Sequence, residues 1–315
     1  MKRTSIYGLF VIMGIFSILA TTSNSTTQNL NQGPAFLSEV HGTIVIEGDA
    51  EIDAFCAGNG TTGLDWANAH VIENFEIALS GASLNPFCIQ LIDVYRFVII
   101  KNCTVTNGQP SWDVPGFHDE ASKYRDAGIH LLNCRNVNIT NCTAVNNGVN
   151  GILIEDSKDC VVTECTVNTN GYGGIQLLNS DDVNITRNDI FYNSRYGVRL
   201  SYSSYNLVTY NNASYNEDSG IRLANDARHN NISWNNASYN EASGIKIYAT
   251  SENVIHNNLL HYNEESCIQG DVAGNQIYDN DCLQEVNYIM IFGIIGGMIA
   301  SAVVLAFIAR NIEKK

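Results

Sequence analysis

Three basic residues recur in this sequence at a nearly constant spacing. Arg199, Arg222 and Lys246 follow one another at steps of 23 and 24 residues, each at the x position of a Gly-Ile-x-Leu type segment. Because side chains of a strand alternate between its two faces, the x residue is expected to face water while the flanking aliphatics face a core. Such a row fits the uronate or sulfate groups of an acidic polysaccharide. Its alternative is a solvated face whose charges pair with acids of the preceding turns, Glu217, Asp218 and Glu241.

An insertion at residues 109–127 supplies a second group of residues that could do chemistry. The insertion contains the candidate binding residues Trp112 and His118, and two x positions of the repeat add His130 and Gln176. Imidazole and carboxylate groups bind divalent ions, so the candidate metal ligands are His118, Asp119, Glu120 and His130. The alternative is a loop that only shields an apolar edge. Nothing fixes the ligand spacing, so we expect no cofactor, with a divalent metal as the alternative.

The elements that carry these residues form a repeat of about 23 residues. Each repeat contains a glycine that is followed by aliphatic residues one and three positions later. These glycines are Gly128, Gly151, Gly174, Gly197, Gly220 and Gly244. An asparagine lies four residues before each of these glycines except the first, and another lies four residues before Cys267. These asparagines are Asn147, Asn170, Asn193, Asn216, Asn240 and Asn263. A second slot, three residues after a β-branched residue, holds Cys142, Cys165, Asn188, Asn211, Asn235, Asn258 and Asn280. Short β-branched segments broken by Gly and Asn are typical of strands and turns.

A fixed period of this length predicts a solenoid whose repeats bury their apolar sides on one another. The asparagines would then stack, each amide donating to one neighbouring coil and accepting from the other. A leucine-rich repeat would need the pattern L-x-x-L-x-L, and this chain has isolated aliphatics instead. We therefore predict an all-β fold, a right-handed parallel β-helix of about 9–10 coils over residues 41–285.

Several motifs match a known family. The segment Ile44 to Ala50 is followed by Gly58-Asn59-Gly60-Thr61, by Val71 to Ile77, and by repeats typified by Asn184 to Asn188. Over residues 41–283 the chain resembles the archaeal and bacterial NosD-like proteins built from parallel β-helix repeats, which are relatives of carbohydrate-binding and sugar-hydrolase β-helices. The resemblance implies the fold and leaves binding, lyase, hydrolase and structural roles open. The NosD name carries an association with copper-enzyme maturation, which no Met or His cluster of this sequence supports.

The two ends of the chain predict its location. Residues 1–20 have the basic start and apolar run of a secretory signal, and residues 21–40 are a polar linker. Residues 286–310 are apolar enough for one transmembrane helix, and residues 311–315 are a basic tail expected inside the cell. The β-helix would then lie outside a single-pass anchor in the cell membrane. Gly293, Gly297 and Ser301 form a small-residue stripe that permits a helix-mediated homodimer, whereas simple anchoring needs no partner.

Composition agrees with a surface role. The net charge of −15 excludes nucleic acid and anionic lipid as natural partners. Sequons for N-glycosylation occur at Asn24, Asn59, Asn102, Asn138, Asn141, Asn184, Asn212, Asn231 and Asn236. Some of these are by-products of the repeat, so the candidates for glycosylation are Asn24, Asn59, Asn212 and Asn236.

The nine cysteines are odd in number, so at least one lacks a partner within the chain. Cys103, Cys142 and Cys165 share one slot on successive coils. They are expected to form an inward stack of thiols, and neighbouring coils would also permit a disulfide. Cys267 and Cys282 could form a disulfide that closes the last coil.

Two classes of function remain open. The first is a membrane-anchored extracellular protein that binds carbohydrate or another envelope component, or acts as a surface scaffold. The second is a polysaccharide-active enzyme, a lyase, hydrolase or epimerase, that uses the outward face of the Gly-Ile-x-Leu strands. Glycoside hydrolysis needs two carboxylates across a sugar site, and Glu155 is the outward carboxylate of these strands. No catalytic residue can be assigned, and the binding class is preferred.

Overall fold

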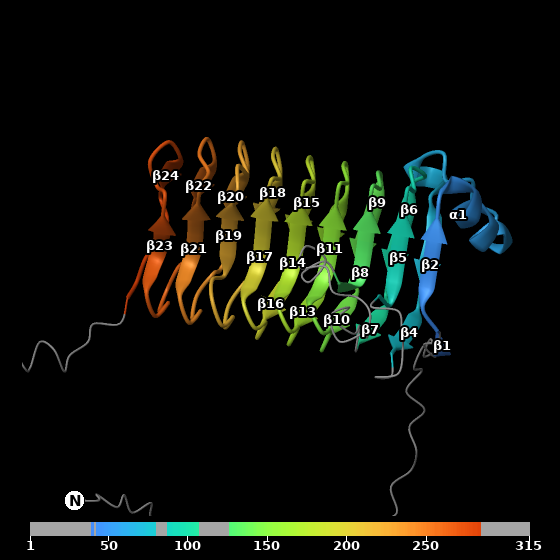
Figure 1. The fold of residues 1–315 in the computed structure, drawn as a ribbon, viewed down its shortest axis with the longest axis horizontal. Helices are drawn as coiled ribbons and strands as arrows, with labels where there is room; N and C mark the ends of the chain where they lie inside the picture. The colour runs from blue at the N-terminus through green and yellow to red at the C-terminus, as the bar shows by residue number, and fades with distance from the viewer. Residues whose placement is uncertain (1–38, 41, 80–86, 107–125, 285–315) are drawn as a thin grey trace, which may run out of the picture. The chain divides into compact units, whose positions relative to one another are not determined.

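The computed structural model describes residues 39–40, 42–79, 87–106 and 126–284, which form a parallel β-helix (Figure 1). The first sheet has nine strands: β2 (Ile44–Glu47), β5 (Ile89–Ile92), β8 (Ala127–Leu132), β11 (Asn150–Glu155), β14 (Gly173–Leu178), β17 (Tyr196–Ser201), β19 (Ile221–Ala224), β21 (Ser243–Tyr248) and β23 (Ser266–Gly270). The second sheet also has nine strands: β3 (His70–Glu73), β6 (Val98–Lys101), β9 (Val137–Thr140), β12 (Val161–Thr163), β15 (Asn184–Thr186), β18 (Leu207–Thr209), β20 (Asn231–Ser233), β22 (Val254–His256) and β24 (Gln276–Tyr278). The third sheet has six strands: β1 (Glu39–Val40), β4 (Phe75–Ala78), β7 (Thr104–Thr106), β10 (Thr143–Val145), β13 (Thr166–Asn168) and β16 (Asp189–Phe191).

All strand pairs are parallel, and each joins equivalent residues of neighbouring coils. Along the first sheet, for example, Ile152 lies beside Ile175, Ile175 beside Val198, and Val198 beside Ile221. These side chains are fully buried, so the aliphatics of the Gly-Ile-x-Leu segments line the core as predicted. The nine-stranded sheets agree with the predicted number of coils.

A short helix, α1 (Asp49–Phe55), lies at the N-terminal end of the coils and is followed by the 3-10 turns η1 (Ala57–Asn59) and η2 (Trp66–Asn68). Asp53 of α1 accepts two hydrogen bonds from Arg96, at 3.0 and 2.9 Å, and one from His70 at 2.8 Å. The bonds from Arg96 and then His70 lower the pKa of Asp53. His70 is buried, and its other ring nitrogen lies 2.8 Å from the Thr61 hydroxyl. These bonds attach α1 to the first coils.

Rows of stacked asparagines run through the interior. Asn193 Nδ2 donates to Asn216 Oδ1 at 3.0 Å, and Asn216 Nδ2 donates to Asn240 Oδ1 at 3.2 Å. Each Oδ1 also accepts the backbone N–H of the preceding asparagine, as Asn216 Oδ1 does from Asn193 at 3.1 Å. Asn216 is fully buried, and its Nδ2 also donates to the carbonyl oxygens of Ile190 and Ser214, so its amide is satisfied by protein partners alone. The predicted row from Asn147 to Asn263 is confirmed.

The repeating glycines are explained by the same row. A Cβ atom at Gly197 would lie 3.0 Å from Asn216 Nδ2 and 2.6 Å from the Gly220 carbonyl oxygen. A Cβ at Gly220 would lie 2.8 Å from Asn240 Nδ2. The coil therefore brings the backbone against the stacked amides at this slot, and only glycine leaves room for them.

A second row of asparagines runs from Asn188 to Asn280, as predicted, and its N-terminal continuation consists of thiols. Cys103, Cys142 and Cys165 are buried and free in this slot, so the predicted inward stack is confirmed. A third row joins Asn206, Asn230, Asn253 and Asn275 through amide hydrogen bonds of 2.9 to 3.0 Å. This third row was not predicted from the sequence.

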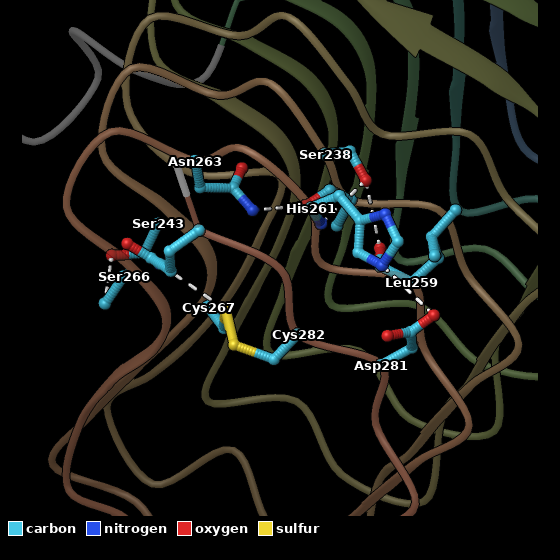
Figure 2. The surroundings of a disulfide bond; sticks show 11 residues. Ser238, Ser243, Leu259, His261, Asn263, Ser266, Cys267, Asp281 and Cys282 are labelled. Carbon is cyan, nitrogen blue, oxygen red and sulfur yellow. Dashed lines mark hydrogen bonds and ion pairs between the residues drawn. A yellow bond between two sulfur atoms is a disulfide. The ribbon is translucent and has the colours of Figure 1, made fainter. Parts of the chain in front are cut away.

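The last coil is closed by a disulfide between Cys267 and Cys282, whose Cα atoms lie 5.8 Å apart (Figure 2). His261 lies near it, with its Nε2 3.1 Å from a carboxylate oxygen of Asp281. Several predicted segments lie outside the described residues: the signal segment, most of the linker, the insertion up to residue 125, the anchor 286–310 and the tail 311–315. Of the helices in the described part of the chain, none has the length and apolar character to cross a membrane.

Replacing Asn216 with Leu should lower the free energy of unfolding by about 1–3 kcal/mol, because the amides of Asn193 and Asn240 each lose a partner in a dry interior. Chemical denaturation of the two proteins measures this difference. Asn168→Leu is the control, since Asn168 is half-buried and lies outside the rows. Equal stability of both variants and the wild type would show that the stacked amides do not hold the coils together.

The buried thiols should resist alkylation in the folded protein. Burial raises the pKa of Cys88, Cys134 and Cys160 to about 12, so at pH 8 only about one thiol in ten thousand is a reactive thiolate. Mass spectrometry after iodoacetamide treatment should find these residues unmodified in the native protein and fully modified in denaturant. Fast modification without denaturant would mean that the coils open readily.

Candidate functional site

The outward face of the first sheet carries the residues predicted at the x position. They form one continuous row, since Gln176 pairs with Arg199, Arg199 with Arg222, and Arg222 with Lys246. Neighbouring strands lie about 4.8 Å apart, so each coil adds one side chain per rung. We call Arg199, Arg222 and Lys246 the basic row.

Arg222 occupies the centre of the basic row and is held by aromatic and acidic neighbours. Its guanidinium donates to the Tyr196 hydroxyl at 2.6 Å and lies over the Tyr196 ring, 4.9 Å from the centroid. The Tyr248 ring lies 5.9 Å away. Asp218 Oδ2 is 3.9 Å from the guanidinium, and the Arg222 side chain is 19% exposed. The group is therefore positioned and partly desolvated, which strengthens its interaction with an incoming anion.

The other two members of the basic row differ in their partners. Lys246 Nζ lies 3.4 Å from Asp218 Oδ1, so a single carboxylate lies between two of the three cations. Arg199 donates to the Tyr172 hydroxyl at 3.3 Å and lies 5.8 Å from the Tyr196 ring centroid. The Nε atoms of Arg199 and Arg222 are buried without a hydrogen-bond acceptor in the described structure. Within the row itself, three cations share one ion-paired carboxylate among the described residues, that of Asp218.

A hollow of about 390 Å³ lies beside the basic row. The residues around it are Ser194, Arg195, Glu217, Asp218, Glu241, Ala242, Lys246, Glu264 and Glu265. Carboxylates outnumber cations in this lining, so an acidic polymer would lie over the strands and avoid the hollow. Of the acids that we considered as partners of the row, only Asp218 has an ion pair with it among the described residues.

The N-terminal half of the same face is covered, which corrects the expectation that the x residues face water. His130 and Gln176 are each 3% exposed, and Leu153 is fully buried. Phe87 accounts for part of this cover, since its ring stacks on the His130 ring with centroids 4.7 Å apart. Gln176 Oε1 is buried and finds no donor in the described part of the chain.

His130 and Glu155 form a buried acid–base pair on this covered part. Gln90 Nε2 lies 3.1 Å from His130 Nδ1 and donates to it, which places the imidazole proton on Nε2. That Nε2 lies 3.4 Å from a carboxylate oxygen of Glu155, and both side chains are about 4% exposed. The Nε2 atom makes no hydrogen bond in the described structure, so the two groups are close together and are not aligned for direct proton transfer to one another.

The remaining predicted residues are placed as follows. Trp112, His118, Asp119, Glu120 and Asn24 lie outside the described residues. Within the described residues, no group of three or more His, Cys, Asp or Glu side chains is arranged to hold a metal ion. Asn59 lies at the N-terminal cap, and Asn212 and Asn236 lie on adjacent coils, where the amide of Asn236 donates to Asn212 at 3.3 Å.

A ladder of tyrosines at one turn is structural in its geometry. Tyr215 and Tyr239 stack with centroids 5.1 Å apart and planes within 5°, and Tyr262 continues the stack at 5.2 Å. Because the rings cover one another's faces, those faces are not available to a sugar.

Three residues around the basic row were not predicted from the sequence: Tyr172, Tyr196 and Tyr248. Tyr196 is 3% exposed, and its ring lies against Arg199 and Arg222. Simple strand alternation would put Tyr196 on the opposite face from Arg199, so the spacing carried no signal for this contact.

Comparison with known proteins places this geometry in a wider group. The family described as "Right handed beta helix region" matches residues 127–282. Among curated proteins, no sequence matches. The structure resembles the periplasmic alginate epimerase AlgG with a TM-score of 0.58 and 16% identity, over 69% of this chain and 50% of that chain. The chain thus spans half the length of AlgG.

Two further solved structures share the fold. The A-module of the Azotobacter vinelandii mannuronan C-5 epimerase AlgE6 matches with a TM-score of 0.52 and 12% identity, over 69% of this chain and 64% of that chain. The enzymatically active domain of tailspike protein 2 from bacteriophage CBA120 matches with a TM-score of 0.55 and 11% identity, over 78% and 36%. The family match covers just under half of the chain and agrees with the right-handed winding predicted from the sequence.

Proposed function

We propose that the protein binds an acidic polysaccharide along the outward face of β17, β19 and β21. The observation that carries the proposal is the basic row, which is fixed in register by strand pairing and repeats once per coil. A polymer whose acidic groups repeat along its length would meet one cation per rung. The exposed ring of Tyr248 beside Arg222 adds apolar contact for sugar rings, whereas the buried ring of Tyr196 packs against the Arg222 guanidinium.

Asp218 supports this assignment because its carboxylate lies where an acidic ligand group would bind, between Arg222 and Lys246. It is the stand-in for that group when no ligand is present. The solved neighbours whose names include alginate or mannuronan epimerase are consistent with a polysaccharide partner. Their identity to this chain is too low for a shared activity to follow.

The location belongs to the same proposal. Residues 1–20 would direct export, residues 286–310 would anchor the chain in the cell membrane, and the β-helix would lie outside. The basic row then faces polymers of the cell envelope or its surroundings, and the protein acts as a surface binder or scaffold. A homodimer through the anchor helix is compatible with this arrangement and is not required by it.

Reversal of the central charge tests the binding site. Arg222→Glu should weaken binding to acidic oligosaccharides about tenfold or more, since it replaces an attractive charge with a repulsive one. Asp218→Asn should strengthen binding about threefold to tenfold, because the internal competitor is removed. Both effects should shrink in high salt. Titration of the purified protein with immobilised acidic glycans measures them.

Arg135→Glu is the matched control, because Arg135 is exposed and lies on a turn away from the row. It changes the net charge equally and should leave affinity unchanged. The affinity for neutral glycans should be unchanged in all three variants. A wild-type protein that binds no acidic glycan at low salt, or an Arg222→Glu variant that binds like the control, would remove the basic row from the proposal.

A second candidate is a polysaccharide-active enzyme, which one observation favours. His130 and Glu155 lie 3.4 Å apart on the same sheet face as the basic row, with the imidazole tautomer fixed by Gln90. One residue could then take a proton from a bound sugar while the other returns it. Because both groups are buried, this chemistry requires a substrate that displaces the groups covering them, and binding alone is ranked first.

The enzyme alternative has a separate test. If His130 and Glu155 act in catalysis, Glu155→Gln and His130→Asn should each lower turnover about a hundredfold or more, while affinity for the polymer changes little. Chromatography and NMR of oligosaccharides incubated with each protein would detect cleavage or epimerisation. A wild-type protein that binds polymer and leaves it chemically unchanged would support the binder and exclude this role.

A further inference from the structure

Three sequons share one row on the outward face of the second sheet. Asn138 in β9 pairs with Val161, Val161 with Asn184 in β15, Asn184 with Leu207, and Leu207 with Asn231 in β20. The three asparagines therefore occupy every second coil, about 10 Å apart at two strand spacings. Each middle residue of the sequon points into the core, so the hydroxyl residue two positions on shares the outward face with its asparagine.

The amides in this row have a distinctive orientation. The Oδ1 atoms of Asn138, Asn184 and Asn231 are buried against the sheet without a donor, whereas each side chain as a whole remains partly exposed. No hydrogen bond joins their Nδ2 atoms to any group of the described structure. Nδ2 is therefore the amide atom that faces outward.

The other five described sequons differ, because in each the Nδ2 atom already donates a hydrogen bond. Asn59 donates to the Val71 carbonyl at 3.1 Å, and Asn102 donates to Asn74 at 3.3 Å. Asn141 donates to Asn102 at 2.7 Å. On the third side of the coils, Asn212 donates to Asp189 at 3.4 Å and Asn236 donates to Asn212 at 3.3 Å.

Attachment of a glycan requires the Nδ2 atom. In N-glycosylation Nδ2 attacks C1 of the first sugar of a lipid phosphate-linked oligosaccharide. The Nδ2–C1 bond forms as the C1–O bond breaks, the lipid phosphate leaves with the bonding electrons, and Nδ2 gives one proton to the transferase. The folded coil accommodates the product without losing a contact only where Nδ2 already faces outward.

The surface around the row suits a covering glycan. From β9 to β20 the two outward rows of this sheet carry no charge, and they consist of Asn138, Thr140, Val161, Thr163, Asn184, Thr186, Leu207, Thr209, Asn231 and Ser233. In a chain of net charge −15 this is an unusual face. Leu207 is 36% exposed between two of the asparagines, so sugars attached on either side would cover it.

We propose that Asn138, Asn184 and Asn231 carry N-linked glycans that cover the outward face of the second sheet. This proposal rests on the extracellular location given under Proposed function, because lipid-linked oligosaccharides are transferred to exported chains. The strands of the first sheet contain no sequon, so the glycans leave the basic row accessible to a polymer. Occupancy should be lowest at Asn231, since the Ser233 hydroxyl of its sequon is buried.

Intact glycopeptide mass spectrometry of the full chain, isolated from its native membranes, measures occupancy at each sequon. We expect Asn138 and Asn184 to be occupied in most molecules and the five hydrogen-bonded sequons in few. The variant Asn138→Gln/Asn184→Gln/Asn231→Gln should lose nearly all attached sugar, whereas the control Asn102→Gln/Asn141→Gln/Asn212→Gln should keep it. Glycans confined to the hydrogen-bonded sequons would overturn the proposal.

Biotinylation of intact cells separates this proposal from the one on which it rests. A chain that reacts with an impermeant reagent and carries no glycan at any of the three positions overturns the glycan row and leaves the binding proposal standing. A chain that does not react at all is not exposed outside the cell, and that result overturns both. A reactive chain with glycans on the row supports both.

Discussion

The structure depends on one constraint, which is that the buried asparagine amides of each row find their partners on the neighbouring coils. Asn216 illustrates it, because its Oδ1 accepts two bonds from Asn193 and its Nδ2 donates to Asn240. A coil that slipped by one residue would break these bonds and turn aliphatic side chains outward. Three rows of this kind hold most coils in a single register, and thiols replace the amides toward the N-terminal end.

Register inside the coils determines what happens outside them. The alternation of a strand means that a fixed inward residue also fixes the outward residue next to it, so equivalent outward side chains stack at one strand spacing. The basic row is the consequence on the first sheet, and the row of Asn138, Asn184 and Asn231 is the consequence on the second. Both are periodic surfaces. The basic row repeats a positive charge from coil to coil, and the asparagine row repeats an exposed amide nitrogen.

The sequence predicted the fold and the inward rows well because they are set by a local repeat. The neighbours of Gly197 and Asn216 are set by the repeat, so the spacing of the sequence alone identifies them. The covered part of the first sheet could not be predicted in this way. His130 and Arg199 occupy the same repeat position, yet Phe87 stacks on one and Tyr196 on the other. These contacts depend on residues outside that position. The third amide row, from Asn206 to Asn275, could have been predicted from the sequence, since its steps are also 22 to 24 residues.

The central claim is that stacking in register creates a surface that recognises a polymer by its repeat. The most direct measurement is calorimetric titration of the full chain with acidic oligosaccharides of increasing length. The account predicts that affinity rises with each added unit until the oligosaccharide spans the coils from β17 to β21, and then levels off. A single acidic sugar that binds as tightly as the longest oligosaccharide would contradict it, because the row would then offer no more than one isolated charge.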